Sequence, residues 1–113
     1  MITNNYANSQ VSFGAQITPK AMSKIQGLTR GNRDFLNVLS GKINTVKTWG
    51  DKNTVITILP GDSVGHDQFV LSNSKLGKRR VVMTEEAPRE NMLAEFMKLT
   101  YDKFIQAEKA LKK

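Results

Sequence analysis

The sequence predicts an α+β fold that combines short N-terminal helices, an antiparallel three- or four-stranded meander and a long C-terminal helix packed on one sheet face. Three observations support this prediction. Helix-starting residues occur at Thr18 and Asn32, runs of β-forming residues lie between residues 54 and 84, and an apolar stripe at helical spacing extends over residues 93–111. Helices towards both ends of the chain and strands between them correspond to the α+β class.

Two helix starts follow the N-terminal segment. Thr18 precedes Pro19, and the threonine oxygen can accept hydrogen bonds from free N–H groups at the start of a helix that should end near Leu28. Asn32 can cap a second helix in the same way. The apolar residues of this second helix are expected on one side, at Phe35, Leu36, Leu39 and Ile43.

The end of the second helix has two interpretations. Gly41 can end it, because glycine is common just after a helix, and the β-branched stretch 43–49 then forms a strand. Alternatively, the helix continues through Gly41. Residues 50–53 favour a turn into the strand that follows.

The middle of the chain predicts the sheet. Residues 54–59 are a continuous run of β-forming residues and should form a central strand. Residues 68–72 and 80–84 predict two further strands, because both are rich in apolar and β-branched side chains. The polar segment 73–78 between them supplies the turn of an antiparallel hairpin.

The last helix is expected to begin around Pro88. Acidic residues near its start and basic residues near its end would complement the helix dipole: Glu85, Glu86, Glu90, Lys109, Lys112 and Lys113. Its apolar stripe comprises Leu93, Phe96, Met97, Thr100, Phe104, Ala107 and Leu111. Further apolar residues lie beside the stripe at Met92, Leu99, Tyr101 and Ile105, so part of this helix is available to a second helix or subunit.

The chain divides into a flexible N-terminal arm, residues 1–17, and a single α+β domain, residues 18–113. The first ten residues are polar and rich in asparagine, which is typical of a mobile end. Residues 11–17 alternate apolar and polar side chains. They are expected to form an edge strand or a docked extended segment, and the alternative is an arm that adds a strand to a partner's sheet.

The composition excludes several classes of protein. The chain has 113 residues, 39% of them hydrophobic and 24% charged, as in one ordinary globular domain. Without cysteine there is no disulfide, thiolate zinc site or thiol nucleophile, and a single histidine, His66, argues against histidine-pair metal sites. The loop that holds Ser63, His66 and Asp67 favours a strand connection over a catalytic site. We therefore expect neither enzymatic activity nor a cofactor.

The lengths of the apolar runs and the composition of the N-terminus indicate the cellular compartment. No apolar run approaches the roughly 20 residues of a membrane-spanning helix, and the N-terminus has no basic and apolar regions of a Sec signal peptide. These features predict a cytoplasmic protein without a membrane span. Secretion by a route other than Sec is left open.

Basic residues gather in two regions of a chain whose formal net charge is +7. The first is the predicted hairpin turn, with four cations: Lys75, Lys78, Arg79 and Arg80. Cations on a ribbon can reach phosphates with little desolvation, although a lysine-rich turn also serves to keep a sheet edge soluble. The second region is residues 1–33, which contain no acid and four cations: Lys20, Lys24, Arg30 and Arg33. An ordinary solvated surface is the alternative there.

These features predict a small basic non-enzymatic binding protein that contacts nucleic acid or another polyanion through the basic hairpin. The alternative is a protein–protein interaction module without a nucleic-acid role: a homodimer, a secreted effector or an assembly subunit. Its contacts would use the C-terminal helix or residues 11–17. No nucleotide-binding motif of the GxxxxGK[ST] or GxGxxG type is present.

Overall fold

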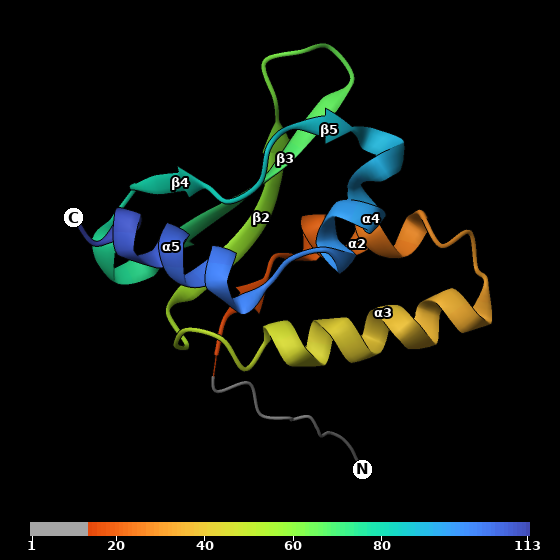
Figure 1. Cartoon of the computed structure of the whole chain (residues 1–113), viewed down its shortest axis with the longest axis horizontal. Coiled ribbons are helices and arrows are strands. Elements are labelled where there is room, and N and C mark those ends of the chain that lie inside the picture. Colours follow the sequence, from red (N-terminus) through yellow and green to blue (C-terminus); the bar gives the residue numbers. More distant parts are fainter. Residues whose placement is uncertain (1–13) are drawn as a thin grey trace.

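A computed structural model describes residues 14–113 (Figure 1). Its elements follow the chain in the order β1 (Gln16–Ile17), α2 (Pro19–Gly27), α3 (Arg33–Val46), β2 (Thr54–Pro60), β3 (His66–Asn73), η1 (Ser74–Leu76), β4 (Arg80–Val82), β5 (Ala87–Pro88), η2 (Arg89–Asn91), α4 (Met92–Met97) and α5 (Tyr101–Leu111). The predicted α+β class and N-terminal helices are confirmed. Most of the predicted N-terminal arm, residues 1–13, lies outside the described residues.

The sheet is mixed, and the prediction of a purely antiparallel meander is wrong. Its strand order is β1-β2-β3-β4, and β5 pairs with the other half of β3. Strands β2 and β3 pair in antiparallel register from Thr54 opposite Asn73 to Pro60 opposite Asp67, whereas β1 runs parallel to β2. Two helices separate β1 from β2 in the chain, so the chain re-enters the sheet in the same direction.

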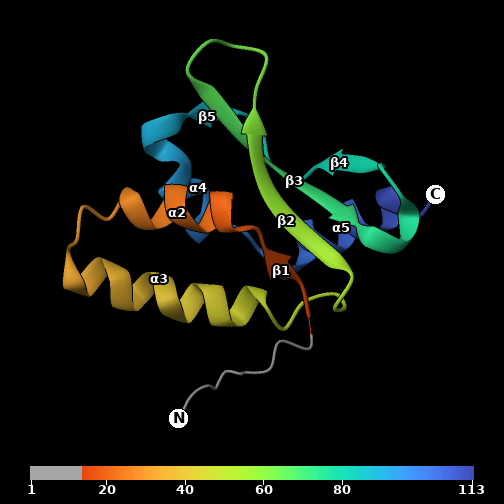
Figure 2. The ribbon, with the colours of Figure 1, turned by 180° about the vertical axis from the view of Figure 1, so that it is seen from behind.

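Helices cover one face of the sheet. Helix α2 contacts β2, α4 contacts β3, and α5 contacts β3 and β4. The strand side chains that meet these helices are fully buried: Ile56, Ile58, Phe69 and Leu71. The rings of Phe69 and Phe96 lie 5.7 Å apart, which joins β3 to α4. Alternate strand residues point to the opposite face. Figure 2 views the ribbon from behind, towards that face.

Both predicted N-terminal helix starts are confirmed. The Oγ1 atom of Thr18 accepts a hydrogen bond from the N–H of Ala21 (3.2 Å), and Oδ1 of Asn32 accepts one from the N–H of Phe35 (3.0 Å). These contacts satisfy N–H groups that have no partner within the helix.

Helix α3 continues through Gly41 to Val46, so the interpretation of residues 43–49 as a strand is wrong. Leu39, Ile43 and Val46 are all buried at helical spacing. Their packing outweighs the preference of β-branched residues for strands. Trp49 follows the helix and also lies in the core, 7% exposed.

The prediction of a single long C-terminal helix is also wrong, because two helices, α4 and α5, occupy this part of the chain. Ala87 and Pro88 belong to β5, and α4 begins only at Met92. Helix α4 ends before Leu99, which is buried, and Thr100 begins α5 by accepting a hydrogen bond from the N–H of Lys103 (3.2 Å). The break lets α4 and α5 pack at different angles over the same sheet face (Figure 1).

Candidate nucleic-acid interface

The turn between β3 and β4 presents its basic residues to solvent. Oδ1 of Asn73 accepts a hydrogen bond from the N–H of Lys75 (2.9 Å), and Gly77 adopts a positive φ of 71° that favours glycine. This geometry forms the predicted hairpin. All four of its cations are exposed: Lys75, Lys78, Arg79 and Arg80.

The end of α5 lies against this turn and adds three more cations. Helix α5 contacts β4, and Nη2 of Arg79 donates a hydrogen bond to the carbonyl oxygen of Lys113. Figure 1 shows the C-terminus beside the hairpin turn, at one end of the longest axis. The exposed lysines of this helix end are Lys109, Lys112 and Lys113. We call these seven residues of the hairpin and of α5 the cationic end.

The sequence alone predicts only a helix-dipole role for the three C-terminal lysines. More than 25 residues of chain separate them from Arg80. Only the packing of α5 on β4 brings the two groups together.

Two carboxylates, those of Glu108 and Asp51, lie next to residues of the cationic end and offset part of its positive charge. Glu108 pairs with Lys112 at 3.9 Å. The Asp51 carboxylate accepts a hydrogen bond from the N–H of Asn53 (2.8 Å), which lowers the pKa of Asp51, and the positive charges of Lys112 and Lys75 lower it further. Asp51 is therefore an anion that the surrounding lysines help to stabilise.

A hollow of about 300 Å³ extends the cationic end onto the uncovered face of the sheet. We call it the sheet hollow. It is lined by Thr18, Val55, Thr57, Ser72, Gly77, Lys78, Arg79 and Arg80. In Figure 2, none of the described helices lies in front of this part of β2 and β3.

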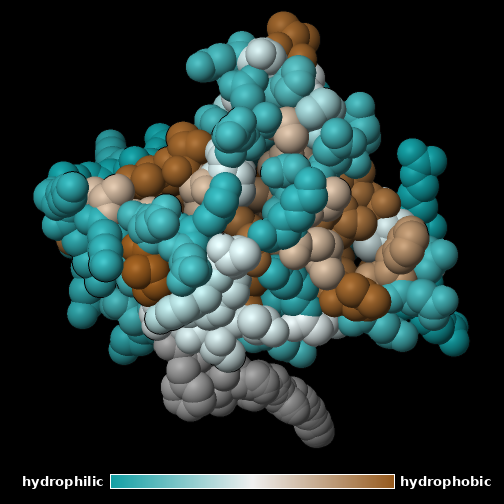
Figure 3. Space-filling model, in the orientation of Figure 1, coloured by the Kyte–Doolittle hydropathy of each residue, from teal (hydrophilic) through white to brown (hydrophobic). Residues whose placement is uncertain are grey.

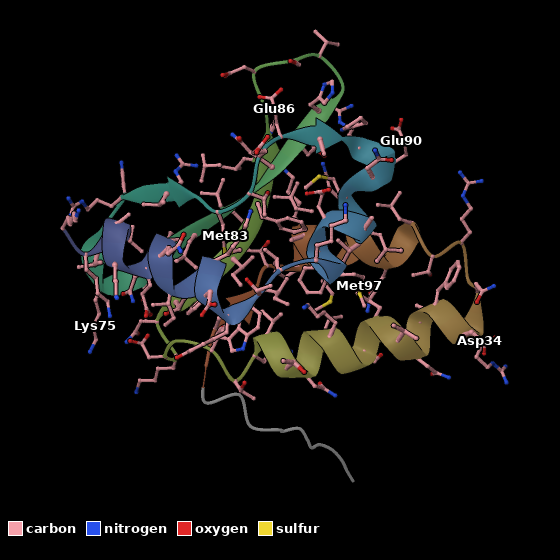
Figure 4. The ribbon with its side chains drawn as sticks, in the orientation of Figure 1. Asp34, Lys75, Met83, Glu86, Glu90 and Met97 are labelled. Atoms are coloured by element: carbon pink, nitrogen blue, oxygen red, sulfur yellow. The ribbon has the colours of Figure 1, made fainter. Side chains whose placement is uncertain are left out.

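The second basic region does not converge with the first. Arg30 and Arg33 lie at the turn between α2 and α3, at the opposite end of the molecule from the hairpin (Figure 1). The labelled side chains of Asp34 and Lys75 mark these two ends in Figure 4. The molecule is 41 Å long, so the two regions form separate surfaces. Lys20 is exposed in the first turn of α2.

Lys24 forms an ion pair with the buried carboxylate of Asp67. Its Nζ atom lies 3.4 Å from Oδ2 of Asp67, and Nε of Arg89 lies 3.4 Å from Oδ1 of the same carboxylate. The Asp67 side chain is only 2% exposed, and its charge is balanced by two half-exposed cations. Lys24 thus joins α2 to β3.

The loop with the only histidine is a strand connection. Nδ1 of His66 lies 3.3 Å from the carbonyl oxygen of Val64, while Asp67 faces Lys24 and Arg89 instead of His66. Within residues 14–113, no three histidine or acidic side chains form a group that could hold a metal ion.

Glu86 has a different role from the one expected at a helix start. Its carboxylate accepts hydrogen bonds from the N–H groups of Asp62 (2.8 Å) and Ser63 (2.9 Å), across the β2–β3 loop (Figure 4). These bonds to backbone N–H groups lower the pKa of Glu86. The expectation that Glu86 supports the last helix is therefore wrong, because its chain segment pairs with β3 before α4 begins.

An apolar groove of about 440 Å³ lies between α3 and α4, at the end of α2. Figure 3 shows hydrophobic side chains gathered on this side of the molecule. Phe35 and Val38 are 58% and 60% exposed and line this groove, whereas Leu39 and Ile43 of the same helix are buried. Leu93 and Met97 face the groove from α4, whereas Met92 and Leu99 are in the core.

Comparison of the chain with protein-family models, curated proteins and solved structures finds no match. Of the helices in residues 14–113, none is both long and apolar enough to cross a bilayer.

Proposed function

We propose that the protein is a non-enzymatic nucleic-acid-binding protein that uses the cationic end. The observation behind this proposal is the association of the basic hairpin with the lysine-rich end of α5. The cationic end has seven basic residues and, among the described residues, two neighbouring carboxylates, Glu108 and Asp51, so positive charge is in excess there. A surface of this kind attracts the phosphate backbone through release of its counterions.

The exposure of these cations supports the proposal physically. A surface lysine or arginine keeps most of its hydration until it meets a phosphate, so binding costs little desolvation. The hairpin turn is held in place in two ways: β4 pairs with β3, and Arg79 contacts Lys113 at the end of α5. Little ordering is then required when a ligand arrives.

Two matched triple variants test the proposal. The first replaces Lys75, Lys78 and Arg80 with Ala, and the second replaces Lys20, Arg30 and Arg33 with Ala; both remove three exposed positive charges. Arg79 is kept because it anchors the C-terminus. Affinity for a duplex of about 20 base pairs is measured by fluorescence anisotropy at several salt concentrations.

The hairpin variant should bind at least tenfold more weakly and show a shallower salt dependence, because each lost phosphate contact removes about 0.9 from the slope of log K against log salt. The second variant should bind nearly as the parent protein does. Equal losses in the two variants would indicate a response to net charge alone, and an absence of binding at 50 mM salt would refute the proposal.

The apolar groove favours a second candidate function, in which two copies of the chain associate through α3 and α4. Exposed Phe35 and Val38 together with Leu93 and Met97 offer an apolar surface of the type found in the core of interfaces. Light scattering of the parent protein and of a Phe35→Ser, Val38→Ser variant tests it. A dimer that the double variant alone converts to a monomer supports it; Val82→Ser is the control, at an exposed apolar residue of β4. A parent protein that is monomeric at high concentration excludes it.

A further inference from the structure

On the uncovered face of the sheet, side chains from β1, β2, β3 and β4 line up in rows across the strands. Opposing residues form a row that runs from Gln16 through Val55 and Ser72 to Arg80. A second row places Thr57 opposite Val70, and Val70 opposite Val82. Oγ1 of Thr18 lies 2.9 Å from Oγ1 of Thr57 and extends that row. The hydroxyls of Thr57 and Ser72 therefore alternate with Val55 and Val70 at the centre of the face, and Arg80 lies at its hairpin end.

The sheet hollow gathers these groups around one space. Three hydroxyl side chains, those of Thr18, Thr57 and Ser72, face it together with the basic side chains of residues 78–80, and no carboxylate is among its described lining residues. Hydroxyl and cationic donors without a competing acid suit a phosphate oxygen. The volume, about 300 Å³, is at the lower end of the range for small-ligand pockets.

Its lining also argues against recognition of bases. Single-stranded nucleic acids are usually bound by aromatic side chains on which successive bases stack. The described residues that line the hollow include none, and Val55 is the largest apolar one. The described lining of the hollow therefore offers an unpaired base no stacking contact that would favour single-stranded over double-stranded nucleic acid.

We propose that the sheet hollow binds the sugar–phosphate backbone of a double-stranded nucleic acid, independently of its sequence. This inference rests on the proposed function and specifies its ligand. The cations of the hairpin supply attraction over a distance, and the hydroxyls of β2 and β3 supply short hydrogen bonds to one phosphate and its sugar. Recognition of this kind fixes the position of the backbone without reading bases.

A hydroxyl-deficient variant, Thr57→Val with Ser72→Ala, tests the role of the hollow while leaving every charge in place. Thr18 is kept because it caps α2. Affinity for duplex should fall about tenfold, since hydrogen bonds to a charged group are lost. The salt slope should stay unchanged, because counterion release depends on the cations. A Thr57→Ser, Ser72→Thr variant retains both hydroxyls and should restore affinity.

The control is Ser40→Ala with Thr45→Val, which removes two hydroxyls from the exposed surface of α3. Thermal unfolding of each variant verifies that it is folded at the assay temperature. The ligands are a 20-base-pair duplex, a second duplex of different sequence, and one of the single strands alone.

The inference predicts equal affinity for the two duplexes, weaker binding of the single strand, and loss of affinity in the hydroxyl-deficient variant only. Preference for the single strand, preference between the duplexes, or parental affinity in that variant would each overturn it. Those results would leave the proposed function intact. Failure of the parent protein to bind any of the three ligands would refute the proposed function itself.

Discussion

The guanidinium group of Arg79 donates a hydrogen bond to the backbone carbonyl of Lys113, so the β3–β4 turn and the end of α5 form one basic surface. The two segments are 34 residues apart in the chain. Their association gives the first prediction about binding.

Replacement of Lys109 and Lys112 with Ala should weaken duplex binding as hairpin substitutions do. Two lost phosphate contacts would lower the salt slope by roughly 2. Anisotropy titrations at several salt concentrations measure both quantities. Lys98→Ala with Lys103→Ala is the control, since these lysines border a cleft that also holds glutamates. An equal effect of the control pair would contradict the assignment to the cationic end.

Lys24 should matter for stability and not for the salt dependence of binding. Replacement of Lys24 and Arg89 with Met leaves the buried Asp67 carboxylate without either cation, which should lower the free energy of unfolding by about 1–3 kcal/mol, less than for a fully buried ion pair because both cations are partly exposed. Urea denaturation measures this loss. In the folded variant, the salt slope should match that of the parent protein. The control is Lys20→Ala, which removes an exposed cation from the same helix and should unfold like the parent protein.

The carboxylate of Glu86 should make stability depend on pH. Hydrogen bonds from Ser63 and Asp62 lower its pKa in the folded protein below the ordinary value of 4.5. The ionised group therefore contributes stability above that value, and the contribution disappears as pH falls through the lowered pKa. Denaturation midpoints measured from pH 6 to pH 3 should decrease less steeply in Glu86→Gln. If both proteins show the same pH dependence, Glu86 does not stabilise the β2–β3 loop.

Two glycines should respond oppositely to alanine. Gly41 lies within α3, and a Cβ there meets open space, so Gly41→Ala should raise the free energy of unfolding by about 0.8–1 kcal/mol. Gly50 has a φ of +67°, and a Cβ there would lie 2.8 Å from Cζ of Phe104. Gly50→Ala should lower stability by at least about 1–3 kcal/mol. Urea denaturation of the two single variants checks both signs.

Local signals made part of the fold predictable. Thr18 and Asn32 begin helices through hydrogen bonds to backbone atoms three residues ahead, and such contacts depend only on nearby sequence. The break before α5 has the same kind of signal in Thr100, but the apolar stripe continues through this position and suggested a single helix. Thus the spacing of apolar residues alone did not separate one long helix from two shorter ones.

Other features depend on contacts between distant segments. The parallel pairing of Gln16 with Val55 has no local signature. The basic hairpin was visible in the sequence because its cations are consecutive or nearly so. In contrast, the hydroxyls of Thr18 and Thr57 lie 39 residues apart, and only the assembled sheet brings them together.

The position of β1 has a consequence for the order of folding. Strands β2 and β3 are joined by a short loop and can pair early, whereas β1 must wait until the chain through α2 and α3 has closed a loop of about 39 residues. Closing that loop costs chain entropy before only two residue pairs are formed. In native-state hydrogen exchange, the amides of β1 should consequently lose protection before those at the centre of β2. The N-terminal edge of the sheet would then be the last part to fold and the first to open.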